Sequence, residues 1–142
     1  LLSRRQRQMC IRDRAKGMCV GPQNAEETEQ TYDTLDKQME DSYSIYNFVK
    51  QTISIRNAFP EIARGTNTFE KDLSNDNVCI FTREYNGEKA VLIFNPSKDE
   101  ASVDVSSLGV NDAVAMLQTT KKAPSYKDGA AKLPAYSVLV LK

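Results

Sequence analysis

The stretch VCIFTREYNGEKAVLIFN, residues 78–95, decides the fold class of this chain. Asn86-Gly87 separates two apolar runs, and this dipeptide favours a two-residue hairpin turn because a type I′ turn needs a positive φ at both central positions. A two-residue loop fixes the register, so that position 85 faces 88, 81 faces 92 and 79 faces 94. The sequence therefore predicts an antiparallel β-hairpin over residues 78–95.

Both faces of this hairpin carry apolar side chains. In the predicted register, one face holds Cys79, Phe81, Leu92 and Phe94, and the other holds Ile80, Val91 and Ile93. Glu84 faces Lys89, which is a favourable cross-strand pair. An antiparallel sheet with one solvated side alternates apolar and polar residues, so we expect both sides of this hairpin to be covered.

The residues around the hairpin continue as short apolar runs between turn signals. The runs cover 101–105, 113–118 and 135–142, and a weaker one, 66–70, precedes the hairpin. Turns are marked by Leu108-Gly109, Asn111-Asp112 and Asp128-Gly129. Short strands at this spacing are typical of an antiparallel sandwich, so we assign residues 66–142 to one antiparallel β-sandwich domain.

The segment before the sandwich, DSYSIYNFVKQTISIRNAFPEIARG (41–65), predicts one long amphipathic helix. Asp41 and Ser42 are both good N-cap residues. An apolar stripe with a period near 3.6 residues follows, and it consists of Ile45, Phe48, Val49 and Ile53. Pro60 ends the helix, because the residue before proline disfavours the α region, and Gly65 marks the boundary to the β part. The expected fold class is therefore α+β.

The first fourteen residues, LLSRRQRQMCIRDR, differ in charge from the rest of the chain. They hold five arginines and one aspartate, which makes +4, so the remaining residues carry −4 in a chain that is neutral overall. A basic arm that binds nucleic acid is one interpretation. The other is that Met9-Cys10-Ile11-Arg12-Asp13 translates the transposon end used in sequencing libraries. We favour the second, so we expect residues 1–14 to be a non-native artefact and expect no nucleic-acid partner.

The composition excludes several classes of site. The chain has no histidine, which removes Ser-His-Asp triads and the usual zinc sites. Cys19 and Cys79 lack metal-ligand spacing, and we expect two unpaired thiols. No phosphate-binding motif and no apolar run of the roughly 18 residues that span a membrane is present. We therefore expect no cofactor, no metal site and no membrane partner.

The helical segment and the β segment together resemble bacterial α-amylases of glycoside hydrolase family 13. The helix is similar to the last barrel helix of that family at Ser44, Phe48, Arg56 and Pro60, while Thr52 stands where the family usually has an apolar residue. The later matches to its C-terminal β-sandwich are Val78, Phe81, Arg83, Tyr85, Asn86, Gly87, Glu88, Asn95, Pro96, Ser97 and the stretch 133–142.

The resemblance implies that residues 15–65 are the end of a truncated (β/α)₈ catalytic barrel. The loop around residues 17–22 would then follow the eighth barrel strand, and such loops build the active-site face. Met18, Cys19, Gly21 and Pro22 are therefore candidate substrate-binding residues that border the cleft. A retaining glycosidase needs two catalytic carboxylates, but no acidic residue here stands in the family's catalytic motifs, so we expect no catalytic residue.

We expect a C-terminal fragment of a starch-degrading glycosidase whose parent hydrolyses α-1,4-glucosidic bonds. Its partners would be the upstream barrel of the same chain and, through the parent, an α-glucan. The resemblance also implies a secreted or extracellular bacterial enzyme. Two alternatives remain open: a free-standing β-sandwich carbohydrate-binding module, and a nucleic-acid binder that uses residues 1–14.

Overall fold

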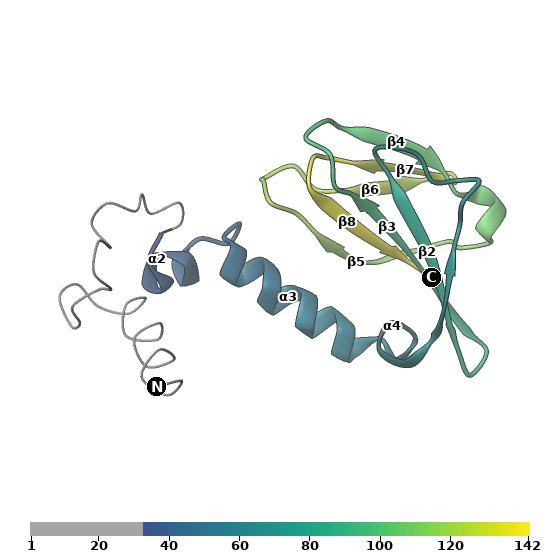
Figure 1. Ribbon diagram of the computed structural model, residues 1–142, viewed down its shortest axis with the longest axis horizontal. Helices are drawn as coiled ribbons and strands as arrows, with labels where there is room; N and C mark the ends of the chain where they lie inside the picture. Colours follow the sequence, from purple (N-terminus) through teal and green to yellow (C-terminus); the bar gives the residue numbers. More distant parts are fainter. Residues whose placement is uncertain (1–32) are drawn as a thin grey trace, which may run out of the picture. The chain divides into compact units, whose positions relative to one another are not determined.

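The computed structural model describes residues 33–142, and the chain divides into two compact units at Asn47 and Phe48. The first unit contains helix α2 (Leu35–Glu40) and the start of α3 (Ile45–Ala58). The second unit contains the rest of α3, the short helix α4 (Pro60–Arg64) and eight strands (Figure 1). No helix within residues 33–142 is long and apolar enough to cross a membrane.

Helix α3 starts later than the sequence predicted. Ser44 occupies the N-cap position, where its Oγ accepts a hydrogen bond from the backbone N–H of Asn47 at 3.2 Å. The predicted caps Asp41 and Ser42 are wrong, because the Asp41 carboxylate accepts from the N–H of Tyr43 at 2.9 Å in a turn that precedes the helix. The end is as predicted, since α3 stops at Ala58 and Pro60 opens α4 as its first residue.

The apolar stripe of α3 is not covered by the described part of the chain. No residue of the helix is buried, and Ile45, Val49 and Ile53 are each about half exposed. An amphipathic helix normally gains its stability by burying its apolar face. The amphipathic packing expected of this helix is therefore not confirmed within residues 33–142.

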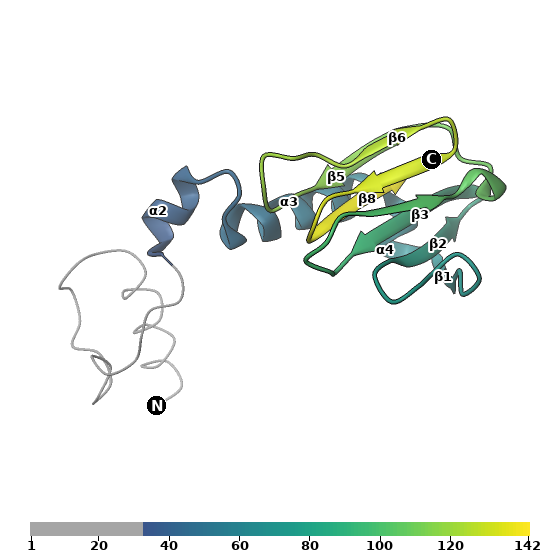
Figure 2. The ribbon, with the colours of Figure 1, turned by 90° about the horizontal axis from the view of Figure 1, so that it is seen from above.

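The strands form two antiparallel sheets. The larger sheet has the order β1 (Thr66–Phe69), β2 (Cys79–Tyr85), β3 (Glu88–Asn95), β8 (Ser137–Leu141) and β5 (Ala113–Leu117), and Figure 2 shows it from β1 at one edge to β5 at the other. The smaller sheet has the order β4 (Ala101–Asp104), β7 (Ala130–Leu133) and β6 (Ser125–Lys127). A 3-10 turn, η2 (Ser106–Leu108), follows β4. The described fold is an α+β unit with antiparallel sheets, which agrees with the expected sandwich.

The hairpin register is confirmed. Tyr85 pairs with Glu88, Phe81 with Leu92 and Cys79 with Phe94. Asn86 and Gly87 have φ angles of 52° and 83°, as the type I′ turn requires. The Asp128-Gly129 turn is also confirmed, but it joins β6 and β7, two short strands that the sequence did not predict.

The core lies between the two sheets. The larger sheet contributes Ile80, Val91, Ile93, Leu139 and Leu141, and the smaller sheet contributes Ala131 and Leu133. The opposite side of the hairpin differs, because Phe81, Leu92 and Phe94 are only half-buried and Phe69 on β1 is 49% exposed. Residues 33–142 therefore cover one side of the hairpin fully and the other only in part.

Candidate functional site

The substrate-binding residues predicted from the sequence lie outside the described part of the chain. Met18, Cys19, Gly21 and Pro22 all precede residue 33, so their placement at a cleft stays a prediction. Cys79 is a free, half-buried cysteine on β2. The adjacent acidic residues Glu40 and Asp41 are both exposed.

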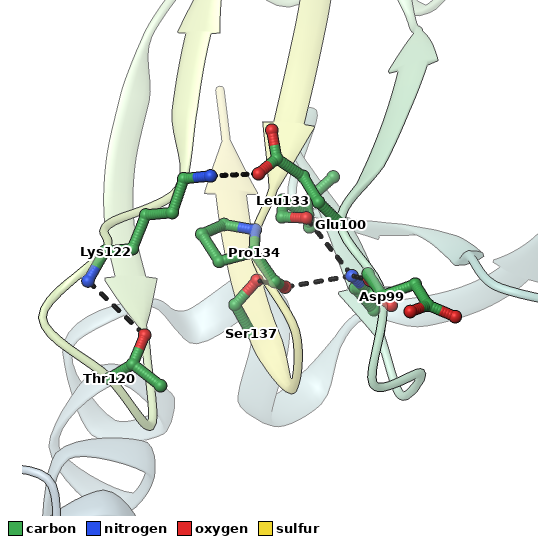
Figure 3. Close-up of polar contacts among 8 residues, drawn as sticks. Asp99, Glu100, Thr120, Lys122, Leu133, Pro134 and Ser137 are labelled. Carbon is green, nitrogen blue, oxygen red and sulfur yellow. Dashed lines mark hydrogen bonds and ion pairs between the residues drawn. The ribbon is translucent and has the colours of Figure 1, made fainter.

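The most completely satisfied polar group of the sandwich is the Asn95 side chain at the end of β3. Asn95 is 1% exposed, and its Nδ2 donates to the carbonyl oxygens of Asp99 at 2.8 Å, Leu133 at 3.1 Å and Pro134 at 2.9 Å. Its Oδ1 accepts from the N–H of Ser97 at 3.0 Å and from the Ser97 hydroxyl at 2.8 Å. Figure 3 shows the Leu133 and Pro134 carbonyl groups converging at this end of the sandwich.

These bonds join the loop after β3 to the loop between β7 and β8. Ser137 adds a second tie, because its hydroxyl donates to the Pro134 carbonyl at 2.7 Å, and the N–H of Tyr136 donates to the Ser97 carbonyl at 3.2 Å. Tyr136 has a φ of 50°, which is unusual for a bulky residue. Since buried polar groups need partners, the cluster acts as a structural joint between the loops.

A second polar cluster joins α4 to the sheet. Glu61 of α4 is 2% exposed, and its Oε1 accepts a hydrogen bond from Lys142 Nζ. The same ammonium group lies 3.2 Å from Oε2 of Glu88 at the start of β3. Arg83 of β2 donates through Nη2 to the Ile62 carbonyl at 2.9 Å. This cluster could not be predicted from the sequence, because Glu61 and Lys142 are far apart in the chain.

The Glu61–Glu88 pair does not meet the requirements of a glycosidase acid and base. The hydrogen bond from Lys142 lowers the pKa of the Glu61 carboxyl below its ordinary value, and burial opposes this only in part. A general acid needs the opposite shift, so that it still holds its proton near neutral pH. The cluster is therefore an ion-paired structural contact.

No other group of the described residues has a catalytic or metal-binding arrangement. Glu61 is the only charged residue that is buried between positions 33 and 142. The same range holds no group of three or more cysteine, aspartate or glutamate side chains that could bind a metal ion. Tyr126 donates its hydroxyl to the Val110 carbonyl at 2.8 Å and packs against the core.

The half-exposed aromatic residues of the larger sheet do not form a flat platform for sugars. The rings of Phe69 and Phe81 lie 5.3 Å apart at 44°, and those of Phe81 and Phe94 lie 5.9 Å apart at 80°. A carbohydrate-binding face of stacked aromatic rings would need coplanar rings. This geometry gives no support to the free-standing carbohydrate-binding module.

The fold and the polar clusters together define a small β-sandwich whose organised side chains serve structure. Residues 72–140 match the model of the family described as "Maltogenic Amylase, C-terminal domain". The matched range runs from the turn before β2 into β8, so it covers most of both sheets. The chain therefore carries the C-terminal domain of an amylase-type enzyme of glycoside hydrolase family 13.

Solved structures agree with this assignment. The chain is similar to Amy13B of Eubacterium rectale, with 97% identity and a TM-score of 0.82 over 90% of this chain and 25% of that one. The trehalulose synthase MutB from Pseudomonas mesoacidophila MX-45 shares the fold at 22% identity, with a TM-score of 0.65 over 89% of this chain and 21% of that one. The α-glucosyl transfer enzyme XgtA is similar at 20% identity and a TM-score of 0.58, over 76% of this chain and 19% of that one.

The chain thus spans about a quarter of the length of Amy13B. A search of the curated proteins found no match. Residues 33–142 hold this C-terminal domain, and the polar clusters described above connect its loops, α4 and the larger sheet.

Proposed function

We propose that this chain is the C-terminal part of an enzyme that hydrolyses α-1,4-glucosidic bonds in starch-like polymers. The observation that carries the proposal is the 97% identity with a quarter of Amy13B, together with the amylase family match over residues 72–140. In this proposal, residues 15–65 end the catalytic barrel and residues 66–142 form the domain that supports it. The carboxylates that cleave the glycosidic bond belong to the upstream part of the parent enzyme.

Two apolar surfaces support the role proposed for the sandwich. One is the partly covered side of the larger sheet, with Phe69, Phe81, Leu92 and Phe94, and the other is the half-exposed stripe of α3. Each large apolar side chain that leaves water contributes roughly 1.5–3 kcal/mol. We propose that the upstream barrel covers both surfaces, and that the loop with Met18, Cys19, Gly21 and Pro22 borders the α-glucan cleft.

We also propose that residues 1–14 are foreign to the enzyme. Their charge differs from that of the rest of the chain. The stretch Met9-Cys10-Ile11-Arg12-Asp13 also corresponds to a translation of the transposon end used in sequencing libraries, which supports the proposal.

The test is a reducing-end assay on soluble starch. The purified 142-residue chain should release no sugar above the blank, because it lacks a catalytic pair. A chimera that carries residues 15–142 in place of the matching quarter of Amy13B should hydrolyse starch. Hydrolysis by the 142-residue chain alone, abolished by replacing one of its own acidic residues, would overturn the proposal.

Two matched substitutions separate the proposed interface from the fold. Leu92 is half-buried on the outer side of the hairpin, and its neighbour Ile93 is fully buried in the core. We expect Ile93→Asp to unfold both the isolated chain and the chimera's C-terminal domain. Leu92→Asp should leave the isolated chain folded but lower the activity or thermal stability of the chimera. An equal effect of Leu92→Asp on the isolated chain would contradict the interface.

A further inference from the structure

Helix α4 is too short to be stable by itself. It has five residues, Pro60–Arg64, and forming a first helical turn costs more conformational entropy than one hydrogen bond returns. Its apolar side chains, Ile62 and Ala63, are only half-buried, and its one buried residue is the charged Glu61. Contacts to the sheet, most of them polar, must therefore hold this helix in place.

Two cations supply these contacts, Arg83 on β2 and Lys142, which directly follows β8. Arg83 donates to the carbonyl oxygens of Glu61 at 3.4 Å and Ile62 at 2.9 Å. The last carbonyl groups of a helix lack partners within it, and positive charge near them is favourable. Lys142 binds the Glu61 carboxylate on one side and lies 3.2 Å from the Glu88 carboxylate on the other. Lys142 thus connects α4 to the start of β3.

The chain leaves α4 through a close contact with β2. A Cβ atom on Gly65 would lie 2.3 Å from the Glu61 carbonyl oxygen and 2.9 Å from the Glu84 carbonyl oxygen. Both are backbone atoms that cannot move aside cheaply. The backbone at Gly65 therefore lies this close to β2 only while α4 packs against the sheet.

The backbone of Lys142 is held independently of its side chain. Its N–H donates to the Asp112 carbonyl at 3.0 Å, and its own carbonyl accepts from the N–H groups of Asn111 at 2.8 Å and Asp112 at 3.0 Å. Removing the ammonium group therefore leaves β8 paired with its neighbours. Within residues 33–142, the side-chain ammonium group forms ion pairs only with the carboxylates of Glu61 on α4 and Glu88 on β3.

We propose that Lys142 is a clasp that holds α4 on the β2–β3 hairpin, so that α4 opens as a local unit when the clasp is lost while both sheets stay folded. Proteins open locally in units of low stability, and such units are those with few buried apolar contacts. Helix α4 meets this description. The proposal concerns the chain itself and does not depend on the activity of the parent enzyme.

The test is amide hydrogen exchange on the full 142-residue chain, read separately for residues 59–65 and 79–85. Lys142→Met keeps the length of the side chain but removes its charge. We expect it to speed exchange at Ile62, Ala63 and Gly65, whose N–H groups are bonded within α4, by roughly tenfold or more. Exchange in β2 should not change. Glu61→Gln should have the same effect, and the double variant should add little to the larger single effect.

Lys122→Met is the matched control, because it removes an exposed lysine that pairs with Glu100 on the loop before β4 (Figure 3). It should leave exchange in α4 unchanged. Trypsin gives a second readout, since an open α4 exposes the Arg64-Gly65 bond to cleavage. Unchanged exchange of α4 in folded Lys142→Met would overturn the proposal. Equal acceleration in β2, or failure of both Lys142→Met and Glu61→Gln to fold, would overturn it as well.

Discussion

Replacing Asn95 with alanine tests whether the polar joint at the end of β3 holds the sandwich together. The substitution removes the Nδ2 donor from the carbonyls of Asp99, Leu133 and Pro134, and the Oδ1 acceptor from Ser97. The loss of this donor affects the three carbonyl groups differently. The Pro134 carbonyl keeps the Ser137 hydroxyl at 2.7 Å, and Asp99 is exposed, so water can replace the lost bond there.

The Leu133 carbonyl carries most of the cost. Leu133 is fully buried, so the lone pair of its carbonyl oxygen that Asn95 engages is left buried without a donor, which costs about 1–3 kcal/mol. Losing the bonds to Ser97 removes about another 1 kcal/mol. The two effects together predict that Asn95→Ala lowers the free energy of unfolding by about 2–4 kcal/mol. This is a large part of the stability of a typical domain, which is about 5–15 kcal/mol.

Urea unfolding followed by circular dichroism measures this change, with Asn77→Ala as the control. Asn77 is exposed, and its side chain makes no hydrogen bond to another residue of 33–142, so its replacement should change the free energy of unfolding by less than about 0.5 kcal/mol. A loss for Asn95→Ala no larger than that of the control would refute the reasoning. It would mean that water satisfies the Leu133 carbonyl as well as Asn95 does.

Three further predictions concern the Lys142–Glu61 pair, residues 1–14 and the exposed stripe of α3. The hydrogen bond between Glu61 and Lys142 is the chief reason why the pKa of Glu61 is lowered and the pKa of Lys142 is raised. The pair therefore stabilises the fold fully between the ordinary carboxyl pKa of 4.5 and the ordinary lysine pKa of 10.5. This stabilisation is lost as the pH falls through the folded pKa of Glu61 or rises through that of Lys142. Glu61→Gln should therefore weaken the fall of the thermal midpoint at acidic pH. An unchanged acid dependence would count against the pair. A chain that starts at Ala15 should keep the thermal midpoint of the full chain in calorimetry, whereas a fall of several degrees would show that residues 1–14 belong to the fold. The exposed stripe of α3 should cause concentration-dependent association in light scattering, relieved by changing Phe48 and Ile53 to serine, and a monomer at every concentration would contradict this.

Local features of the fold could be predicted because their causes are local. The Asn86-Gly87 turn favours one backbone conformation by itself, and the alternation of apolar residues on each side of it fixes the pairing down to Phe81 and Leu92. Pro60 ends α3 for an equally local reason, since it restricts the residue before it. The predicted cap of α3 was wrong, because three nearby residues could each serve and the hydrogen bonds made by Ser44 to Gln38 and Asn47 decided among them.

The candidate site also has features that could be predicted from the sequence and features that could not. The absence of histidine excluded histidine-based catalytic triads and zinc sites from composition alone. Asn95 was visible as one letter of a family-like motif, but its bonds to the Leu133 and Pro134 carbonyls join positions that are remote in the sequence. Neither hydrophobic periodicity nor the spacing of residues in the sequence predicts such a contact.

The hairpin and the end of the helical part could be predicted because turn chemistry and periodicity act between near neighbours, and the likeness to an amylase's C-terminal domain was visible in the same short stretches. Three features became visible only in the folded chain: β4, β7 and β6 form a separate sheet, the outer side of the hairpin is only partly covered, and Lys142 contacts Glu61. These contacts depend on how strands that are distant in the chain pair and stack. Their energy is gained only after loop closure has brought those strands together.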